Sequence, residues 1–127
     1  MKSKRKQLSK DERLKVYNKY NGHCAYCGIK LEYKDMQVDH FVSVFKNTYE
    51  LANGVDIETF KNYMPSCRMC NFYKRAGGIE TMRKNIKKLY VQLERDFDYR
   101  LAKRYGLIEE TPKEIGFFFE DYNEGDK

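Results

Sequence analysis

Apolar side chains recur at three- and four-residue steps in two parts of the chain. The first part follows "SKDE", in which Ser9 and Glu12 have the spacing of a capping box. A helix is therefore predicted over about residues 10–20, ending at "NG". The second part predicts one long amphipathic helix over 79–105, which ends at Gly106 and packs its apolar stripe into the core. This stripe consists of Ile79, Met82, Ile86, Leu89, Leu93, Phe97 and Leu101.

Shorter apolar runs lie between these two helices. The run "LEYKDMQVDHFVSVF" predicts a β-hairpin with the Asp39-His40 dipeptide near a strand end. Because neighbouring residues of a regular strand face opposite ways, the two side chains can share a site only at a bulge or a strand end. A short helix is expected around 56–61, another begins at Asn71 and stops at a glycine pair, and "EIGFFFED" predicts a terminal strand.

The composition is typical of one small domain with a lean core. The 127 residues are 41% hydrophobic and 35% charged, which favours an additional staple such as a metal. Lys and Arg number 25 against 19 Asp and Glu, and the net charge of +6 suits a polyanion such as nucleic acid. We expect a single domain over 1–127, with a core at 21–76 and a helical extension at 79–120. The basic tail at 1–8 is either a solvated leader or an arm that contacts phosphates.

No targeting or membrane segment is predicted. The stretch "MKSKRKQLSK" is basic but has no apolar segment behind it, unlike a secretory signal. No apolar run approaches the length of a membrane span, and "FFF" at 117–119 is far too short. We therefore expect a cytoplasmic protein that binds no membrane and whose thiols stay reduced.

The four cysteines occur as two Cys-x-x-Cys pairs. In a reducing compartment such pairs indicate metal ligands rather than disulfides, and four thiolates form the closed tetrahedral set of structural zinc. The predicted zinc ligands are Cys24, Cys27, Cys67 and Cys70. A closed site leaves no position for water, so this zinc is expected to stabilise the fold and not to catalyse. His23, beside Cys24, is a further candidate ligand, but an ordinary loop histidine is the favoured interpretation because four cysteines are already present.

The insertion between the two cysteine pairs contains the groups suited to catalysis. If zinc brings its ends together, Asn71 lies near Asp39, and their carboxylate and amide oxygens are ligands that Mg²⁺ prefers. A histidine beside such an ion, here His40, can take the proton from an attacking water. Taken alone, the Asp-His dipeptide fits an ordinary strand equally well. The basic residues suited to a polyphosphate backbone are Arg68, Lys74, Arg75, Arg83 and Lys84.

The pattern "CAYCG … VDHF … GVDIETFKN … CRMCNFYK" resembles the zinc-knuckle HNH endonucleases over residues 24–75. The resemblance implies an α+β fold with a zinc-stapled ββα-metal core, or His-Me finger, in which a hairpin and a helix surround one catalytic Mg²⁺ or Mn²⁺. The roles that it implies are His40 as general base, Asp39 and Asn71 as ligands of the catalytic ion, and Asn62 as the residue that pins the hairpin and orients His40. Gly54 and Asp56 also fit the loop of that family.

The implied activity is hydrolysis of double-stranded DNA to 5′-phosphate and 3′-hydroxyl ends, with Arg68, Lys74 and Arg75 at the DNA. Two features depart from the family. The third signature position is Asn71 rather than His, and the proline that often follows the first His is absent from "DHFVS". Members with Asn at the third position are familiar, so activity is still expected.

Other functions fit parts of the same pattern. A zinc-ribbon DNA-binding module without catalysis explains the cysteines and the charge, and a junction resolvase shares the active-site plan. The cytoplasm of a bacterial host cell is the expected location, with a phage genome as one candidate source. A second copy of the chain and phage packaging proteins are candidate partners.

Overall fold

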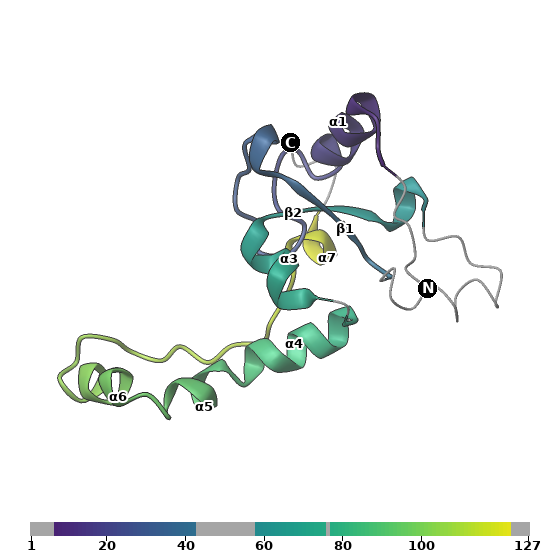
Figure 1. Ribbon diagram of the computed structural model, residues 1–127. Coiled ribbons are helices and arrows are strands. Elements are labelled where there is room, and N and C mark those ends of the chain that lie inside the picture. The colour runs from purple at the N-terminus through teal and green to yellow at the C-terminus, as the bar shows by residue number, and fades with distance from the viewer. Residues whose placement is uncertain (1–6, 43–57, 76, 123–127) are drawn as a thin grey trace.

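The computed structural model of the protein describes residues 7–42, 58–75 and 77–122 and has a small α+β fold around a two-stranded sheet (Figure 1). In chain order its elements are α1 (Lys10–Asn18), the 3₁₀ helix η1 (Tyr33–Asp35), β1 (Gln37–His40), the 3₁₀ helix η3 (Phe60–Asn62), β2 (Tyr63–Ser66), α3 (Arg68–Lys74), α4 (Ile79–Lys87), α5 (Leu89–Leu93), α6 (Phe97–Arg104) and α7 (Phe118–Asp121). Helix α1 packs against β2, and α3 packs against β1. None of the helices in the described parts has the length and apolar content that a bilayer crossing requires.

Helix α1 begins where the sequence predicts. The backbone N–H of Glu12 donates to the Ser9 hydroxyl at 3.2 Å, and the backbone N–H of Ser9 donates to the Glu12 carboxylate at 3.0 Å. This reciprocal pair gives acceptors to N–H groups that the helix itself cannot satisfy. After Asn18 the chain turns through Asn21 and Gly22, whose φ angles of 56° and 79° are left-handed. The prediction of a capped helix that ends at this Asn-Gly pair is confirmed.

The sheet joins strands that are far apart in the sequence. The two strands are antiparallel, and the register places His40 opposite Tyr63. A hairpin built from 31–45 alone is therefore not formed in its described part, because the polar "YKD" segment makes the turn η1 instead of a strand. Strand β1 ends at His40, so the prediction that Asp39-His40 lies near a strand end is confirmed. The short helix expected around 56–61 falls partly outside the described residues, and the described part contains η3.

The core lies around the cysteine loops and the strands. Its buried apolar residues are Val16, Cys24, Ala25, Tyr26, Leu31, Met36, Tyr63, Met64, Cys70, Met82 and Phe117. The C-terminal segment joins this core through two backbone hydrogen bonds, in which Phe118 N–H donates to the Tyr26 carbonyl at 3.0 Å and Phe119 N–H donates to the Ala25 carbonyl at 2.8 Å. Residues 117–119 of this C-terminal segment therefore pack against the first cysteine loop.

The terminal strand predicted for "EIGFFFED" is wrong, because residues 118–121 form α7. The Glu120 carboxylate accepts a hydrogen bond from the Phe117 N–H at 2.9 Å, and this contact satisfies a donor at the start of the helical turn. Arg83 of α4 donates to the same carboxylate, with one contact at 3.0 Å. The ion pair with Arg83 lowers the pKa of Glu120, so the carboxylate stays charged in this role.

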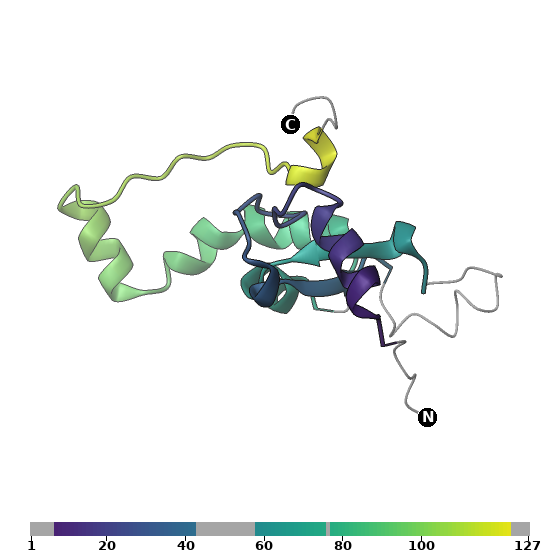
Figure 2. The ribbon, with the colours of Figure 1, turned by 90° about the horizontal axis from the view of Figure 1, so that it is seen from above.

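The single helix predicted over 79–105 is divided into α4, α5 and α6. Lys88 interrupts it with φ −88° and ψ 0°, and the Asp96 carboxylate accepts from the Tyr99 N–H at 2.9 Å. An acceptor in that position favours a new helix start over continuation of the old helix. Met82 in α4 is buried, whereas α5 and α6 contain no buried residue, so only the first part of the predicted stripe reaches the core. Figure 2 shows α5 and α6 extending away from the sheet before the chain returns to α7.

Candidate metal centre and active site

Two loops bring the four cysteines together. Cys24 and Cys27 follow α1, whereas Cys67 is the N-cap of α3 and Cys70 lies in its first turn. The four sulfur atoms all lie within 4.8 Å of one another. Zinc–sulfur bonds of about 2.3 Å in a tetrahedron place neighbouring sulfurs roughly 3.8 Å apart, and Cys27 Sγ lies 3.8 Å from Cys67 Sγ. The predicted grouping is confirmed, and the donor set fits a structural zinc ion.

Local backbone geometry shapes each cysteine loop. Gly28 closes the first loop with a φ of 81°, and a Cβ at this position would lie 2.9 Å from a ring carbon of Phe118. A glycine is therefore required both by the turn and by the close approach of the C-terminal segment. The backbone N–H of Tyr26 donates to Cys24 Sγ, and that of Cys70 donates to Cys67 Sγ, both at 3.4 Å. Such donors stabilise the thiolate form that binds metal.

The sulfur cluster needs a cation to carry four negative charges. A hydrogen bond between Cys24 and Cys70 lowers the pKa of Cys24 and raises that of Cys70, and burial raises the pKa of Cys27 to about 11. One thiolate is thus favoured, while each further thiolate is opposed by the charge already present. Zinc removes this opposition, because it binds the thiolates in place of their protons.

His23 lies beside the cluster and behaves as a loop histidine. Its Nδ1 donates to the Tyr20 carbonyl at 3.1 Å, and its ring stacks on Phe118 with a centroid separation of 5.0 Å. The ring is thus engaged by the turn after α1 and by Phe118, in agreement with the expectation that the four sulfurs form the ligand set without it.

Asp39 is buried between the first cysteine loop and α3. Its Oδ2 accepts a hydrogen bond from the Tyr26 hydroxyl at 2.5 Å and lies 3.1 Å from Lys74 Nζ. Burial and the Asp39 charge raise the pKa of Tyr26, so its hydroxyl keeps the proton that it donates. Lys74 Nζ also donates to the His40 carbonyl at 3.2 Å. One ammonium group therefore joins the Asp39 side chain to the His40 backbone.

Lys74 is not available to a DNA backbone. Only 3% of its surface is exposed, and its ammonium group is engaged inside the protein. The prediction that Lys74 binds DNA is therefore wrong. The physical reason is that the buried Asp39 carboxylate requires a cation, and the last turn of α3 supplies it. The other two predicted DNA-binding residues, Arg68 and Arg75, are exposed at the two ends of α3.

Asn71 lies at the same interface as Asp39. Its Nδ2 donates to Gln37 Oε1 at 2.6 Å, and Gln37 lies two residues before Asp39, on the same face of β1. On α3, Asn71 and Lys74 are three residues apart and share a face. The structure therefore brings the two predicted ligands of the catalytic ion to one strand–helix interface. Both offer hard oxygen donors, a set that Mg²⁺ completes with water and phosphate oxygens, although Lys74 already neutralises part of the Asp39 charge.

His40 is directed to a different side of the strand. Its Nε2 contacts Oε1 of Glu58, and its ring meets the Tyr63 ring edge-on at a centroid distance of 5.4 Å. Only 7% of its surface is exposed. Asp39 and His40 therefore have separate side-chain partners, as strand alternation requires, and they are linked through Lys74.

Asn62 fixes the backbone that follows His40. Its Oδ1 accepts from the Val42 N–H at 2.8 Å, and its Nδ2 donates to the Val42 carbonyl at 3.1 Å. The Asn62 carbonyl also accepts from the Phe41 N–H at 2.8 Å. These three bonds hold the two residues after β1 against η3, whereas the predicted role of Asn62 in orienting His40 stays a prediction. Gly54 and Asp56 lie outside the described residues.

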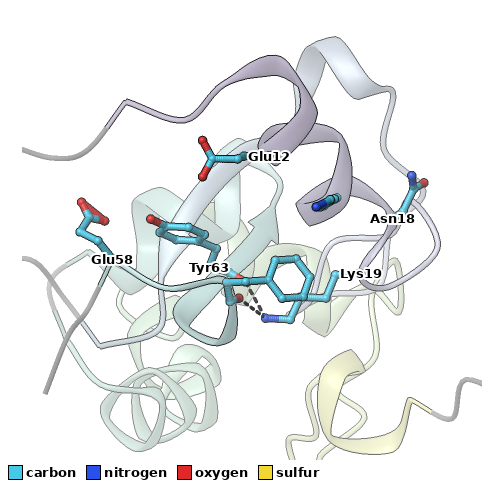
Figure 3. A pocket seen from close by; sticks show the side chains of 7 residues that line it. Glu12, Asn18, Lys19, Glu58 and Tyr63 are labelled. Carbon is cyan, nitrogen blue, oxygen red and sulfur yellow. Dashed lines mark hydrogen bonds between the residues drawn. The ribbon is translucent and has the colours of Figure 1, made fainter.

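A cleft of about 570 Å³ opens between α1 and the segment 58–63, and Glu58, the partner of His40, is one of its lining residues. Figure 3 shows Glu58 and Tyr63 at one end of this cleft and Lys19 at the other. Lys19 Nζ donates to the carbonyls of Phe60 and Tyr63 at 3.0 and 2.7 Å, and burial lowers its pKa. Lys19 therefore fastens the end of α1 to the start of β2.

Three site residues were missed by sequence reasoning. Tyr26 stands between two cysteines, Gln37 precedes the Asp-His pair on the same strand face, and Glu58 is far from His40 in sequence. The alternation of β1 could have placed Gln37 beside Asp39, but no local signal pairs Tyr26 with Asp39 or Glu58 with His40. Comparisons of the chain with family models, with curated proteins and with solved structures find no match.

The sulfur cluster predicts close to one zinc ion per chain. Cys67→Ser should lose both the zinc and cooperative unfolding, because a structural site contributes folding free energy directly. Metal analysis and chemical unfolding would measure the two effects. Met69→Ser is the matched control, since this side chain lies between the two ligands of the second loop but is 80% exposed. Folded wild-type protein without bound zinc would contradict this account.

The buried ion pair predicts a large stability effect at Lys74. Lys74→Met should lower the free energy of unfolding by about 3–5 kcal/mol, because it leaves the Asp39 carboxylate buried without its cation. Lys84→Met, which removes an exposed lysine of α4, should change it by less than about 0.5 kcal/mol. Urea unfolding of both variants measures the two losses of unfolding free energy. Equal losses would mean that the Asp39–Lys74 ion pair is not required for stability.

Proposed function

We propose that the protein is a metal-dependent endonuclease of the HNH type that hydrolyses phosphodiester bonds of double-stranded DNA. The observation that carries this proposal is that four polar residues of the pattern belong to one strand–strand–helix unit, with His40 on the opposite side of β1 from Asp39. Asp39 and Asn71 lie at the β1–α3 interface, and Asn62 holds the backbone that follows His40. A zinc ion bound by the four cysteines fixes the start of α3 and with it Asn71.

In this proposal each residue has one chemical task. His40 takes the proton from an attacking water, and Asn62 keeps the following backbone, and so the ring, in place. Asp39 and Asn71 would hold a divalent ion, Mg²⁺ or Mn²⁺, which would supply positive charge to the phosphate and the 3′ leaving oxygen. The products are 5′-phosphate and 3′-hydroxyl ends. Zinc has no part in this chemistry, because four thiolates leave it no open position.

The solvent-facing side of α3 suits the DNA backbone. Arg68 and Arg75 are exposed at its two ends, and Met69 and Phe72 between them are 80% and 69% exposed. Arginines can bind phosphate oxygens, while the apolar side chains can contact sugars. The same surface would serve a zinc-stabilised DNA-binding module without catalysis, which is the second candidate.

A comparison of cleavage rates on branched and linear DNA would distinguish a junction resolvase from a nuclease that acts on ordinary duplex DNA.

The nuclease proposal predicts that His40→Ala lowers the rate of plasmid cleavage by roughly 10²–10⁴-fold, the usual contribution of a general base. DNA affinity should stay unchanged, because the ring does not hold the duplex. His23→Ala is the matched control and should cleave like the wild type, since the His23 ring contacts the Tyr20 carbonyl and Phe118 and lies outside the proposed site. Cleavage by His40→Ala at the wild-type rate would favour the non-catalytic module.

DNA binding should depend on the charge of α3. The double variant Arg68→Gln/Arg75→Gln should weaken binding to any duplex sequence and reduce the slope of log affinity against log salt by roughly 0.9 for each lost contact. Arg100→Gln/Arg104→Gln makes the same change in charge on exposed positions of α6 and should leave the slope unchanged. Equal effects of the two doubles would show that α3 is not the DNA surface.

A further inference from the structure

Glu58 contacts the imidazole of His40 at a position that no sequence motif marks. The contact joins Glu58 Oε1 to His40 Nε2, and the two side chains are 21% and 7% exposed. A carboxylate accepts hydrogen bonds and does not donate them, so the ring nitrogen in this contact carries the proton. In the neutral imidazole the other nitrogen, Nδ1, then keeps its lone pair.

Among the described residues, the other contacts around His40 mainly hold its backbone and restrict the rotation of its ring less. Lys74 Nζ binds the His40 carbonyl, and Asn62 holds the two residues that follow. The Tyr63 ring packs at 90° to the imidazole and limits the movement of the imidazole on that side. Neither a backbone bond nor an apolar ring edge distinguishes one imidazole nitrogen from the other. Glu58 makes that distinction, because its charge attracts the N–H.

We propose that Glu58 is the positioning residue of His40: it holds the imidazole with its proton on Nε2, so that Nδ1 is the atom that accepts the proton of the attacking water. The catalytic part rests on the nuclease proposal, whereas the position of the proton is a property of the folded protein alone. In the reaction the water proton moves to Nδ1 and the water oxygen forms the new bond to phosphorus. The bond between phosphorus and the 3′ oxygen breaks, and the 3′ oxygen takes a proton from solvent to become the 3′-hydroxyl. Glu58 takes no proton and stabilises the imidazolium by its charge.

The location of Glu58 links this task to that of Asn62. Glu58 lies two residues before the start of η3, and η3 ends at Asn62. One short segment therefore supplies the carboxylate that orients the His40 ring and the amide that pins the backbone after it. Glu58 also stands at the end of the cleft in Figure 3, opposite Lys19, which fastens this segment to α1 through the Phe60 carbonyl.

The proton position can be tested by imidazole ¹⁵N NMR without measuring activity. The chain has two histidines, and their contacts predict opposite tautomers: Nδ1–H for His23, which donates to the Tyr20 carbonyl, and Nε2–H for His40. At a pH where both rings are neutral, wild-type zinc-loaded protein should show a low-field N–H proton on Nε2 of His40. Glu58→Ala should lose that signal while the His23 signals stay in place. A proton on Nδ1 of His40, or an unchanged Nε2 signal in Glu58→Ala, would overturn the proposal.

Kinetics test the consequence for cleavage. Glu58→Gln should lower kcat at least about tenfold with little change in KM for DNA, because the amide keeps the size of the side chain but not the charge that orients the ring. Glu58→Asp should recover part of kcat. Glu12→Gln is the matched control, since Glu12 lines the same cleft and glutamine also completes a capping box.

The two proposals fail in different ways. If His40→Ala abolishes cleavage while Glu58→Gln and Glu58→Ala cleave at the wild-type rate, the nuclease stands and the positioning role of Glu58 is wrong. If wild-type protein cleaves no DNA in Mg²⁺, the nuclease proposal is wrong, and the NMR signals of His40 still decide whether Glu58 holds the ring.

Discussion

The rest of this structure depends on the repulsion among four clustered cysteine sulfurs. Without a cation, the negative charge of one thiolate opposes ionisation of the others. The four sulfurs join a loop after α1 to the first turn of α3, and everything between those two points is an insertion whose ends they hold. A chain of 127 residues with 35% charged residues has little apolar surface for this task. Metal binding would therefore contribute folding free energy and, at the same time, fix the position of the helix that carries Asn71.

A second constraint follows from the first. Bringing the cysteine loop against α3 buries the Asp39 carboxylate, which then needs partners of its own. The Tyr26 hydroxyl and the Lys74 ammonium group supply them. Because Lys74 also binds the His40 carbonyl, the charge pair inside the protein sets the position of the strand end where His40 lies. The four cysteines, the buried ion pair and the strand end form one connected unit.

Contacts between residues close in sequence, and motifs with a fixed chemistry, could be predicted from the chain alone. The Ser9–Glu12 capping box, the grouping of the cysteines and the strand end at His40 are of this kind. In each case a local rule or a fixed ligand chemistry determines the outcome.

The remaining features depend on tertiary contacts that leave no local signal. The stripe over 79–105 has the period of one helix, yet Asp96 caps a new one and most of the stripe is exposed. The cluster of basic residues around α3 predicts an exposed Lys74, and only the fold shows that a buried carboxylate lies beside it. Glu58 could not be paired with His40 from sequence, since the two residues are 18 positions apart and no helix or strand periodicity relates them.

We propose that this protein uses two metal ions for different purposes, a structural zinc and a separate catalytic ion. The most direct measurement is a time course of supercoiled plasmid with zinc-loaded wild-type protein, with and without added Mg²⁺ or Mn²⁺. We expect nicked or linear DNA with 5′-phosphate ends only when the second ion is added, while the zinc content stays constant throughout. Cleavage that proceeds equally without added ion, or no cleavage with it while the protein remains folded and zinc-bound, would contradict the account.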